Sequence, residues 1–133
     1  MIQLVIDTNV IISAALSPNG NPAKILSLIS IENEIHVFFN MKILIEYKEV
    51  LSRPKMSISQ DMQIRIVNAI IRMGSVFEPI TSTISLPDET DRIFYDTAKE
   101  SNSILITGNT KHYPAEPFIM TPIDFLIELN REN

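Results

Sequence analysis

The feature that most limits the fold of this chain is a set of short, uninterrupted apolar runs rich in β-branched residues. Leu4-Val5-Ile6 and Ile104-Leu105-Ile106 are the clearest of them. A strand without alternating polar residues must be covered on both faces, which is typical of a parallel sheet. Longer segments with helical spacing separate these runs. The alternation predicts right-handed βαβ units, and hence a three-layer α/β/α fold with a central, mostly parallel sheet.

Caps, turns and periodicity predict the remaining elements. Further strands are expected at 35–39, 76–77 and 118–120. Helices are expected from Pro22, with Asn21 as its N-cap, then over about 41–53, 59–73 and 87–101, and after Thr121-Pro122. The chain has 133 residues, of which 45% are hydrophobic, and it shows no repeat, linker or low-complexity tract. We therefore expect one domain over residues 1–133.

The helix expected over 59–73 has an unusually wide apolar stripe. Its apolar residues are Met62, Ile64, Ile66, Val67, Ile70, Ile71 and Met73. A stripe that covers more than half of the circumference is typical of a helix buried on two sides. A partner surface, and with it a homodimer, is the alternative.

Composition excludes several kinds of site. The chain has no cysteine and two histidines, His36 and His112. Disulfides, thiolate zinc sites, a cysteine nucleophile and a multi-histidine cage are therefore excluded. Any metal is expected on oxygen ligands, which suit Mg²⁺ or Mn²⁺. The net charge of −5 argues against a purely electrostatic binder of nucleic acid.

No apolar stretch approaches the ~20 residues of a membrane span. The first apolar run has no basic flank and is interrupted by Asp7, unlike a signal peptide. We expect a cytoplasmic protein with no membrane association.

Polar residues directly follow two of the predicted strands. Asp7 comes after Leu4-Val5-Ile6, and Thr107-Gly108-Asn109 comes after Ile104-Leu105-Ile106. In open parallel sheets, sites lie at the carboxyl ends of the strands, so these residues should meet at one edge. Asp7 has an alternative interpretation as a helix N-cap or turn acid. Thr107 has two as well, because its hydroxyl suits either a neighbouring carboxylate or its own backbone.

Two helical acids are candidates for the same edge. Glu46 lies ~40° outside the apolar arc of its helix, although a solvated surface acid is the alternative. Asp91 lies in the first turn of a helix for which Asp88 is the best N-cap candidate, whereas Asp96 is expected to be solvated in mid-helix. Three carboxylates at one place raise each other's pKa unless a cation holds them, so the set predicts a site for a hard divalent metal.

The ordered set of motifs resembles the PIN domain, a family of metal-dependent ribonucleases that includes the VapC-type toxins of type II toxin–antitoxin pairs. The matching segments are 5–10, 45–51 around Glu46, 88–91 with Ala98, and 105–109. Segments 111–114 and 121–126 resemble a toxin branch of the family.

The resemblance implies a role for each candidate residue. Asp7, Glu46 and Asp91 would hold Mg²⁺ or Mn²⁺, with Asp88 and Asn109 as further metal candidates. Asn9 and Thr107 would orient the carboxylates. Lys111, His112 and Arg92 would contact the substrate. Asn109 stands where many members carry a fourth acid, which removes one charge and weakens the case for a second metal.

The function implied is an endoribonuclease in which metal-activated water cleaves RNA, leaving a 5′-phosphate and a 3′-hydroxyl. As the toxin of a toxin–antitoxin pair it would have a protein antitoxin as partner. One alternative is a PIN-fold module with weakened catalysis that binds RNA or a protein. A phosphotransfer enzyme with Asp7 as nucleophile is a third, more distant one, because Asn9 stands where such enzymes carry a second acid and no glycine-rich phosphate loop is present.

Overall fold

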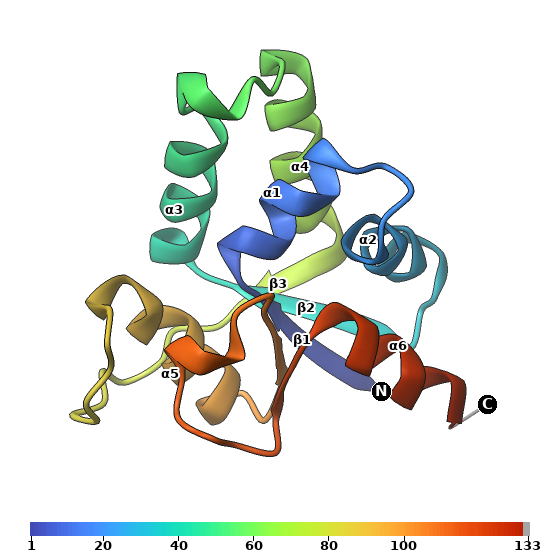
Figure 1. The fold of residues 1–133 in the computed structure, drawn as a ribbon. Helices are drawn as coiled ribbons and strands as arrows, with labels where there is room; N and C mark the ends of the chain where they lie inside the picture. Colours follow the sequence, from blue (N-terminus) through green and yellow to red (C-terminus); the bar gives the residue numbers. More distant parts are fainter. Residues whose placement is uncertain (132–133) are drawn as a thin grey trace.

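The structure, a computed structural model, describes residues 1–131 and confirms the α/β prediction (Figure 1). Its sheet is fully parallel and has the strand order β3-β2-β1-β4-β5. The strands are β1 (Ile2–Ile6), β2 (Ile35–Phe39), β3 (Gly74–Val76), β4 (Ile104–Ile106) and β5 (Ile119–Met120). Each predicted strand is present, with ends that differ by two residues or fewer.

Helices cover both faces of the sheet. The helices are α1 (Thr8–Leu16), α2 (Asn21–Ile31), α3 (Met41–Leu51), α4 (Gln60–Met73), α5 (Arg92–Glu100) and α6 (Pro122–Arg131). Short 3₁₀ turns are η1 (Pro54–Met56), η2 (Glu89–Asp91) and η3 (Thr110–His112). Helices α1 to α4 gather on one side of the sheet and α5 lies on the other, while α6 packs against α2 (Figure 1). No helix in the described part of the chain is long and apolar enough to cross a membrane.

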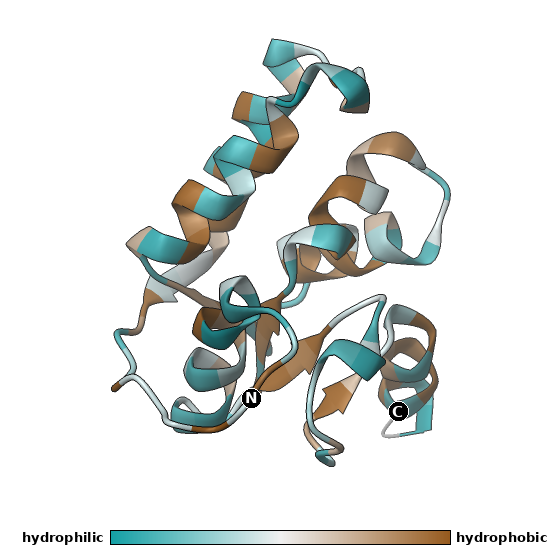
Figure 2. Cartoon of the chain, turned by 60° about the vertical axis from the view of Figure 1, so that its left-hand side comes forward, coloured by the Kyte–Doolittle hydropathy of each residue, from teal (hydrophilic) through white to brown (hydrophobic). Residues whose placement is uncertain are grey.

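The central strands form the hydrophobic centre of the molecule. The central strands are mostly hydrophobic, whereas the helices mix hydrophobic and hydrophilic residues (Figure 2). Leu4, Val5, Ile6, Leu105 and Ile106 all have 0% of their surface exposed. Consecutive residues of a strand point to opposite faces, so complete burial of all of them means that both faces are covered. This is the physical reason why the runs lack polar alternation.

The sheet has a topological switch point at the central strand β1. The chain moves from β1 outward to β2 and β3 on one side, then returns to place β4 and β5 on the other. Ile6 of β1 is in register with Ile106 of β4, and the Asp7 amide donates to the Ile106 carbonyl at 2.9 Å. A crevice forms outside the carboxyl ends of strands at such a point. Asp7 and Thr107, the next residues of the two strands, therefore lie side by side.

Two local predictions are wrong at helix α2 and helix α4. Gly20, not Asn21, is the N-cap of α2, and no side chain caps that helix. Helix α4 does not bury its whole apolar stripe: it packs against α1, α2, α3 and β2, and its buried residues are Ile66, Val67 and Ile70. Ile64 and Ile71 are 53% and 42% exposed. The alternative of a partner surface stays a prediction.

Asp96 is also placed differently from the prediction. It is 4% exposed, and its Oδ2 accepts a hydrogen bond from the Ser82 amide at 2.9 Å. The segment between β3 and η2 folds back along α5 and covers what would otherwise be a solvated helix face. The prediction of a solvated Asp96 is therefore wrong, because it considered the helix without this covering segment.

Candidate functional site

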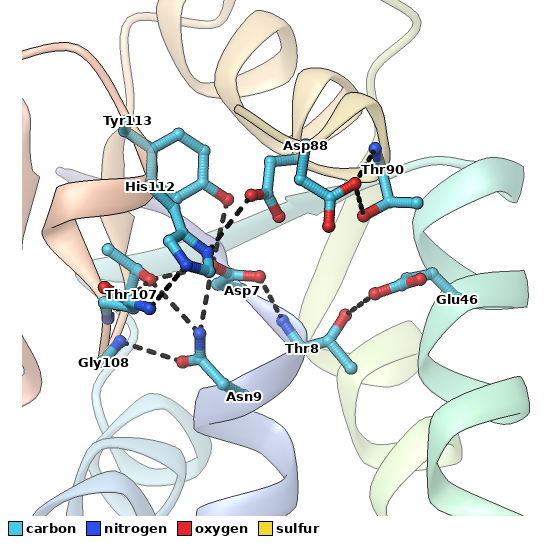
Figure 3. Close-up of polar contacts among 12 residues, drawn as sticks. Asp7, Thr8, Asn9, Glu46, Asp88, Thr90, Thr107, Gly108, His112 and Tyr113 are labelled. Atoms are coloured by element: carbon cyan, nitrogen blue, oxygen red, sulfur yellow. Dashed lines mark hydrogen bonds and ion pairs between the residues drawn. The ribbon is translucent and has the colours of Figure 1, made fainter. Parts of the chain in front are cut away.

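Asp7 is the N-cap of helix α1 and is also the most heavily hydrogen-bonded acid of the site (Figure 3). Its Oδ1 accepts from the Thr8 amide at 2.8 Å. Its Oδ2 accepts from Thr107 Oγ1 at 2.8 Å, Tyr113 OH at 2.9 Å and Asn9 Nδ2 at 3.3 Å. With three donors Oδ2 has little capacity left, whereas Oδ1 has one donor and can accept a further partner.

Burial and hydrogen bonding act in opposite directions on Asp7. Its side chain is buried, and the loss of solvent raises the pKa of the carboxyl above its usual value. The hydrogen bonds from Thr107 and Tyr113 lower the pKa, because they favour the charged form. Burial is the larger effect. A carboxylate held in this state gains by pairing with a cation.

Asn9 and Thr107 tie the start of α1 to the end of β4. Asn9 Oδ1 accepts from the Gly108 amide at 2.9 Å, and Asn9 Nδ2 donates to Thr107 Oγ1 at 3.4 Å. A Cβ on Gly108 would lie 3.2 Å from Asn9 Oδ1, so the close approach explains the glycine. Thr107 Oγ1 also accepts from the Asn109 amide at 3.1 Å. Both interpretations of Thr107, carboxylate partner and backbone partner, hold at once.

Asp91 carries an unsatisfied oxygen that faces this cluster. Its Oδ2 is buried and has no hydrogen-bond partner among the described residues. The ring of His112 lies beside this oxygen, with its Nδ1 3.6 Å away. Burial, with the charges of Asp7 and Asp88, raises the pKa of Asp91 to about 6. Buried polar atoms are nearly always paired, so this oxygen calls for a partner such as a cation.

Glu46 reaches the site from helix α3 but is engaged by another residue. Thr8 Oγ1 donates to Glu46 Oε2 at 2.7 Å (Figure 3). The charge of Glu46 also contributes to the raised pKa of Asp91, so the two acids share one electrostatic environment. Glu46 and Lys42 line a groove of about 390 Å³ between α3 and the segment that leads into α5.

Asp88 and Arg92 stabilise the segment before α5. Asp88 is the N-cap of the 3₁₀ turn η2, whereas the helix predicted over 87–101 begins at Arg92 with Asp91 as its N-cap. Asp88 accepts from the Thr90 amide at 3.0 Å and the Thr90 hydroxyl at 2.8 Å. These bonds lower the pKa of Asp88. Arg92 donates to the Ser82 carbonyl and hydroxyl, the Ile84 carbonyl and Glu89. All guanidinium N–H groups are thereby used, and none is left for the substrate phosphate that the sequence assigned to Arg92.

Lys111, His112 and Asn109 lie together after β4. Lys111 and His112 are exposed on η3. Asn109 Nδ2 lies 2.9 Å from His112 Nε2, so Asn109 contacts the histidine ring and not an acid.

The candidate acids fit a divalent cation in their chemistry but do not yet enclose one. Asp7 Oδ1 and Asp91 Oδ2 have free acceptor capacity, and carboxylate oxygens suit Mg²⁺ or Mn²⁺. Yet over residues 1–131 no three acidic or histidine side chains are close enough to hold one ion as they stand. The hydrogen bond between Thr8 and Glu46 accounts for part of this, because it holds Glu46 at the start of α1.

A prominent groove of the molecule does not coincide with these acids. It measures about 770 Å³ and lies between α2 and α4, with Leu26, Ile66 and Ile70 in its lining. None of the candidate site residues lines it. We place the site at the switch point, because the buried acids and their hydrogen-bond partners converge there.

Two site residues were missed by the sequence analysis. Thr8 positions Glu46, and Tyr113 donates to Asp7 across 106 residues of chain. Thr8 directly follows the candidate acid Asp7 in the sequence. Its hydroxyl, at the N-terminus of a helix, was the signal that could have identified it as a site residue. Tyr113 gave no local signal, because only the parallel pairing of β1 with β4 brings it to Asp7.

Comparison with known proteins identifies the family and the fold of this chain. The family model for the PIN domain matches residues 3–111. An uncharacterized protein of Methanocaldococcus jannaschii, MJ1680, is 37% identical over 111 residues, which are 81% of this chain and 71% of the relative.

Two solved structures share the fold at low sequence identity. PAE2754 from Pyrobaculum aerophilum has a TM-score of 0.63 at 12% identity and covers 98% of both chains. VapBC2 from Rickettsia felis, bound to a DNA fragment from their promoter, has a TM-score of 0.59 at 11% identity, covering 90% of this chain and 97% of the other. With a family model that spans most of its length, the chain belongs to the PIN-domain family.

Proposed function

We propose that this protein is a metal-dependent endoribonuclease. PIN domains are generally nucleases, which supports an enzyme that hydrolyses nucleic acid. The observation that carries the metal-dependent form is the buried, unpaired Oδ2 of Asp91 next to the buried Asp7. A buried carboxylate oxygen without a partner destabilises the folded protein unless an ion binds to it.

Asp7, Asp91 and Glu46 would hold the ion. Mg²⁺ or Mn²⁺ bound there would activate a water molecule and neutralise charge on the scissile phosphate. Thr107, Tyr113 and Asn9 hold Asp7 Oδ2, which leaves Oδ1 turned to the ligand side. Glu46 has one oxygen on Thr8 and keeps the other for the ion. Asp88 is exposed and caps η2, so its contribution would be the charge that it adds near Asp91.

Lys111 and Lys42 are the cationic groups available for the RNA backbone. Lys111 is exposed on η3, and Lys42 lines the groove beside Glu46. The chain has a net charge of −5, so the acids of the site would repel phosphate until a divalent cation offset them. We therefore expect RNA binding near the site to depend on the metal.

The proposal is tested by cleavage of single-stranded RNA with Mg²⁺ or Mn²⁺. Asp7→Asn should abolish cleavage, because the amide removes the charge and turns a donor toward the ion. Asp124→Asn is the matched control, since it is the same substitution at an exposed acid of α6. Equal cleavage by wild type and Asp7→Asn would refute the assignment.

A second candidate function is a PIN-fold module with weakened catalysis that binds RNA or a protein. Two observations favour it: Asn109 bonds a histidine where many members of the family carry an acid, and no three acidic or histidine ligands are assembled among residues 1–131. Titration with Mg²⁺ and Mn²⁺ separates the two candidates. If neither ion raises the melting temperature and RNA is bound but left intact, the binding module is the better description.

We further propose that the protein acts in the cytoplasm as the toxin of a toxin–antitoxin pair. This chain shares only its fold with VapBC2 of Rickettsia felis, and that shared fold is the support for the proposal. Induced expression should arrest growth of a bacterial host for the wild type and Asp124→Asn, but not for Asp7→Asn. Growth arrest by all three proteins would show that toxicity does not depend on the site.

A homodimer through the exposed side of α4 is part of the same proposal. Ile64 and Ile71 provide an apolar surface there. Size-exclusion chromatography over a range of concentrations tests it. Ile64→Arg should shift a dimer to a monomer, and a wild type that is a monomer at high concentration would refute the dimer.

A further inference from the structure

The two ring nitrogens of His112 face two residues of the candidate site. Its Nε2 lies 2.9 Å from Asn109 Nδ2, and its Nδ1 lies 3.6 Å from Asp91 Oδ2. The side chain is 51% exposed, and the contact with Asn109 restrains the orientation of the ring. The ring is thereby aimed at the one buried carboxylate oxygen that lacks a hydrogen bond.

The distance between His112 and Asp91 is compatible with two ligands on one ion. Imidazole and carboxylate ligands bind metals at about 2.1 Å, so neighbouring ligands lie about 3 Å apart at a right angle and farther apart at wider angles. The observed 3.6 Å is close to this range. It is too long for a hydrogen bond, which explains why Asp91 Oδ2 is unsatisfied in spite of its neighbour.

Asn109 supplies the support that a ligating histidine normally has. A metal-bound histidine donates its second ring N–H to an acceptor, which fixes the orientation of the ring. A half-turn of the Asn109 amide exchanges its nitrogen for its oxygen and would let it accept from Nε2. Asn109 then orients a nitrogen ligand instead of providing an acid. This orienting role would explain both why residue 109 is not an acid and why His112 lies beside it.

We propose that His112 is a metal ligand of this site, together with Asp91, and that the site therefore prefers Mn²⁺ to Mg²⁺. Imidazole suits transition metals, whereas Mg²⁺ selects oxygen ligands and water. The inference rests on the metal of the proposed function and deepens it. It replaces both the oxygen-only ligand set and the RNA contact that the sequence predicted for His112.

The chain offers a clean spectroscopic test, because His36 and His112 are its only histidines. Mn²⁺ is added to the metal-free protein, and pulsed electron paramagnetic resonance detects coupling of the ion to imidazole ¹⁴N. We expect coupling in the wild type and in His36→Gln, and none in His112→Gln. His36 is a matched control because it lies on β2 and contacts Ser75.

Affinity provides a second readout. Calorimetric titration should show that His112→Gln weakens Mn²⁺ binding by about tenfold or more and Mg²⁺ binding less, so that the preference for Mn²⁺ falls. Melting temperatures confirm that the variant is folded. Coupling that persists in His112→Gln, or an unchanged ratio of the two affinities, would overturn the inference.

The outcomes also separate this inference from the proposed function. Mn²⁺ that binds without ¹⁴N coupling while RNA is cleaved overturns the role of His112 and leaves the nuclease intact. Mn²⁺ that couples to His112 while RNA stays uncleaved supports the ligand and refutes the nuclease. If neither Mn²⁺ nor Mg²⁺ binds, both are overturned.

Discussion

Removal of the Asp91 charge should stabilise the metal-free protein at neutral pH. In the folded protein, burial and the charges of Asp7 and Asp88 raise the pKa of Asp91 from 3.8 to about 6. Folding therefore opposes ionisation of this group. Asp91→Asn keeps the size of the side chain and removes the charge, so the variant avoids the cost of ionising a buried carboxylate.

The magnitude follows from the linkage between pKa and stability. A shift of about two units corresponds to about 3 kcal/mol at most, and the partial exposure of the side chain reduces this to about 1.5–2 kcal/mol. Because the pKa is raised on folding, the folded state retains the proton more strongly than the unfolded state. The contribution of Asp91 to the stability of the wild type therefore falls as the pH rises from about 4 to about 6 and is constant above that range.

The assay is urea unfolding in the presence of a chelator at pH 7.5 and pH 4. At pH 7.5 the variant should be more stable by the amount above, and at pH 4 the difference should fall below about 1 kcal/mol. Asp124→Asn, at an exposed acid, controls for the change in net charge. A variant that is no more stable than the wild type at pH 7.5, or that gains equally at both pH values, would refute the reasoning.

The same variant links stability to the metal. Wild-type protein should gain stability when Mn²⁺ is added, because an ion that binds only the folded state shifts the unfolding equilibrium. Asp91→Asn lacks a ligand and should gain far less. The difference in stability by which Asp91→Asn exceeds the wild type should therefore shrink or reverse as the concentration of Mn²⁺ increases.

Three further substitutions test individual contacts. Tyr113→Phe removes one of the three donors to Asp7 Oδ2 and should weaken Mn²⁺ binding about tenfold in calorimetry; an unchanged affinity would count against the positioning role. Tyr47→Phe removes the hydrogen bond that the fully buried hydroxyl donates to the Ile6 carbonyl, and urea unfolding should show a loss of about 1–2 kcal/mol, whereas no loss would mean that the bond contributes little. Arg92→Lys keeps the charge but loses the forked contacts of the guanidinium with Ser82 and Ile84. Limited proteolysis should therefore cleave the segment before α5 faster, while the affinity for RNA stays constant. A fall in RNA affinity would instead support the predicted contact between Arg92 and the substrate.

The fold could be predicted from the sequence because a doubly covered parallel sheet leaves a strong pattern. The strands Ile35–Phe39 and Ile104–Ile106 were predicted with their observed ends, since apolar runs bounded by polar residues define them. Helix α1 was not predicted, although Val10, Ile11 and Ala14 have the spacing of its buried face. The interpretation of Asp7 as an N-cap is consistent with a helix that begins at Thr8, which the prediction omitted.

The candidate site could be located from the sequence but not assembled. The edge was predictable because Asp7 and Thr107 directly follow strands, and parallel strands bring their carboxyl ends together. The contacts of Arg92 and Tyr113 were not, because each depends on a segment that folds over another element. Sequence spacing determines where an acid emerges from a sheet, whereas its hydrogen-bond partners come from distant parts of the chain.

The two interpretations of Asp7, helix N-cap and site acid, describe a single arrangement. Oδ1 accepts from the Thr8 amide and so satisfies the start of α1, while Thr107 and Tyr113 hold Oδ2 from the side of β4 and η3. A carboxylate fixed at both oxygens cannot turn away from the crevice. The positive end of the α1 dipole and the hydroxyl donors favour its charged form and oppose the larger effect of burial, which raises its pKa. The cap is therefore part of how the fold presents a rigid acid to an ion, and a substitution that breaks the cap should also weaken the site.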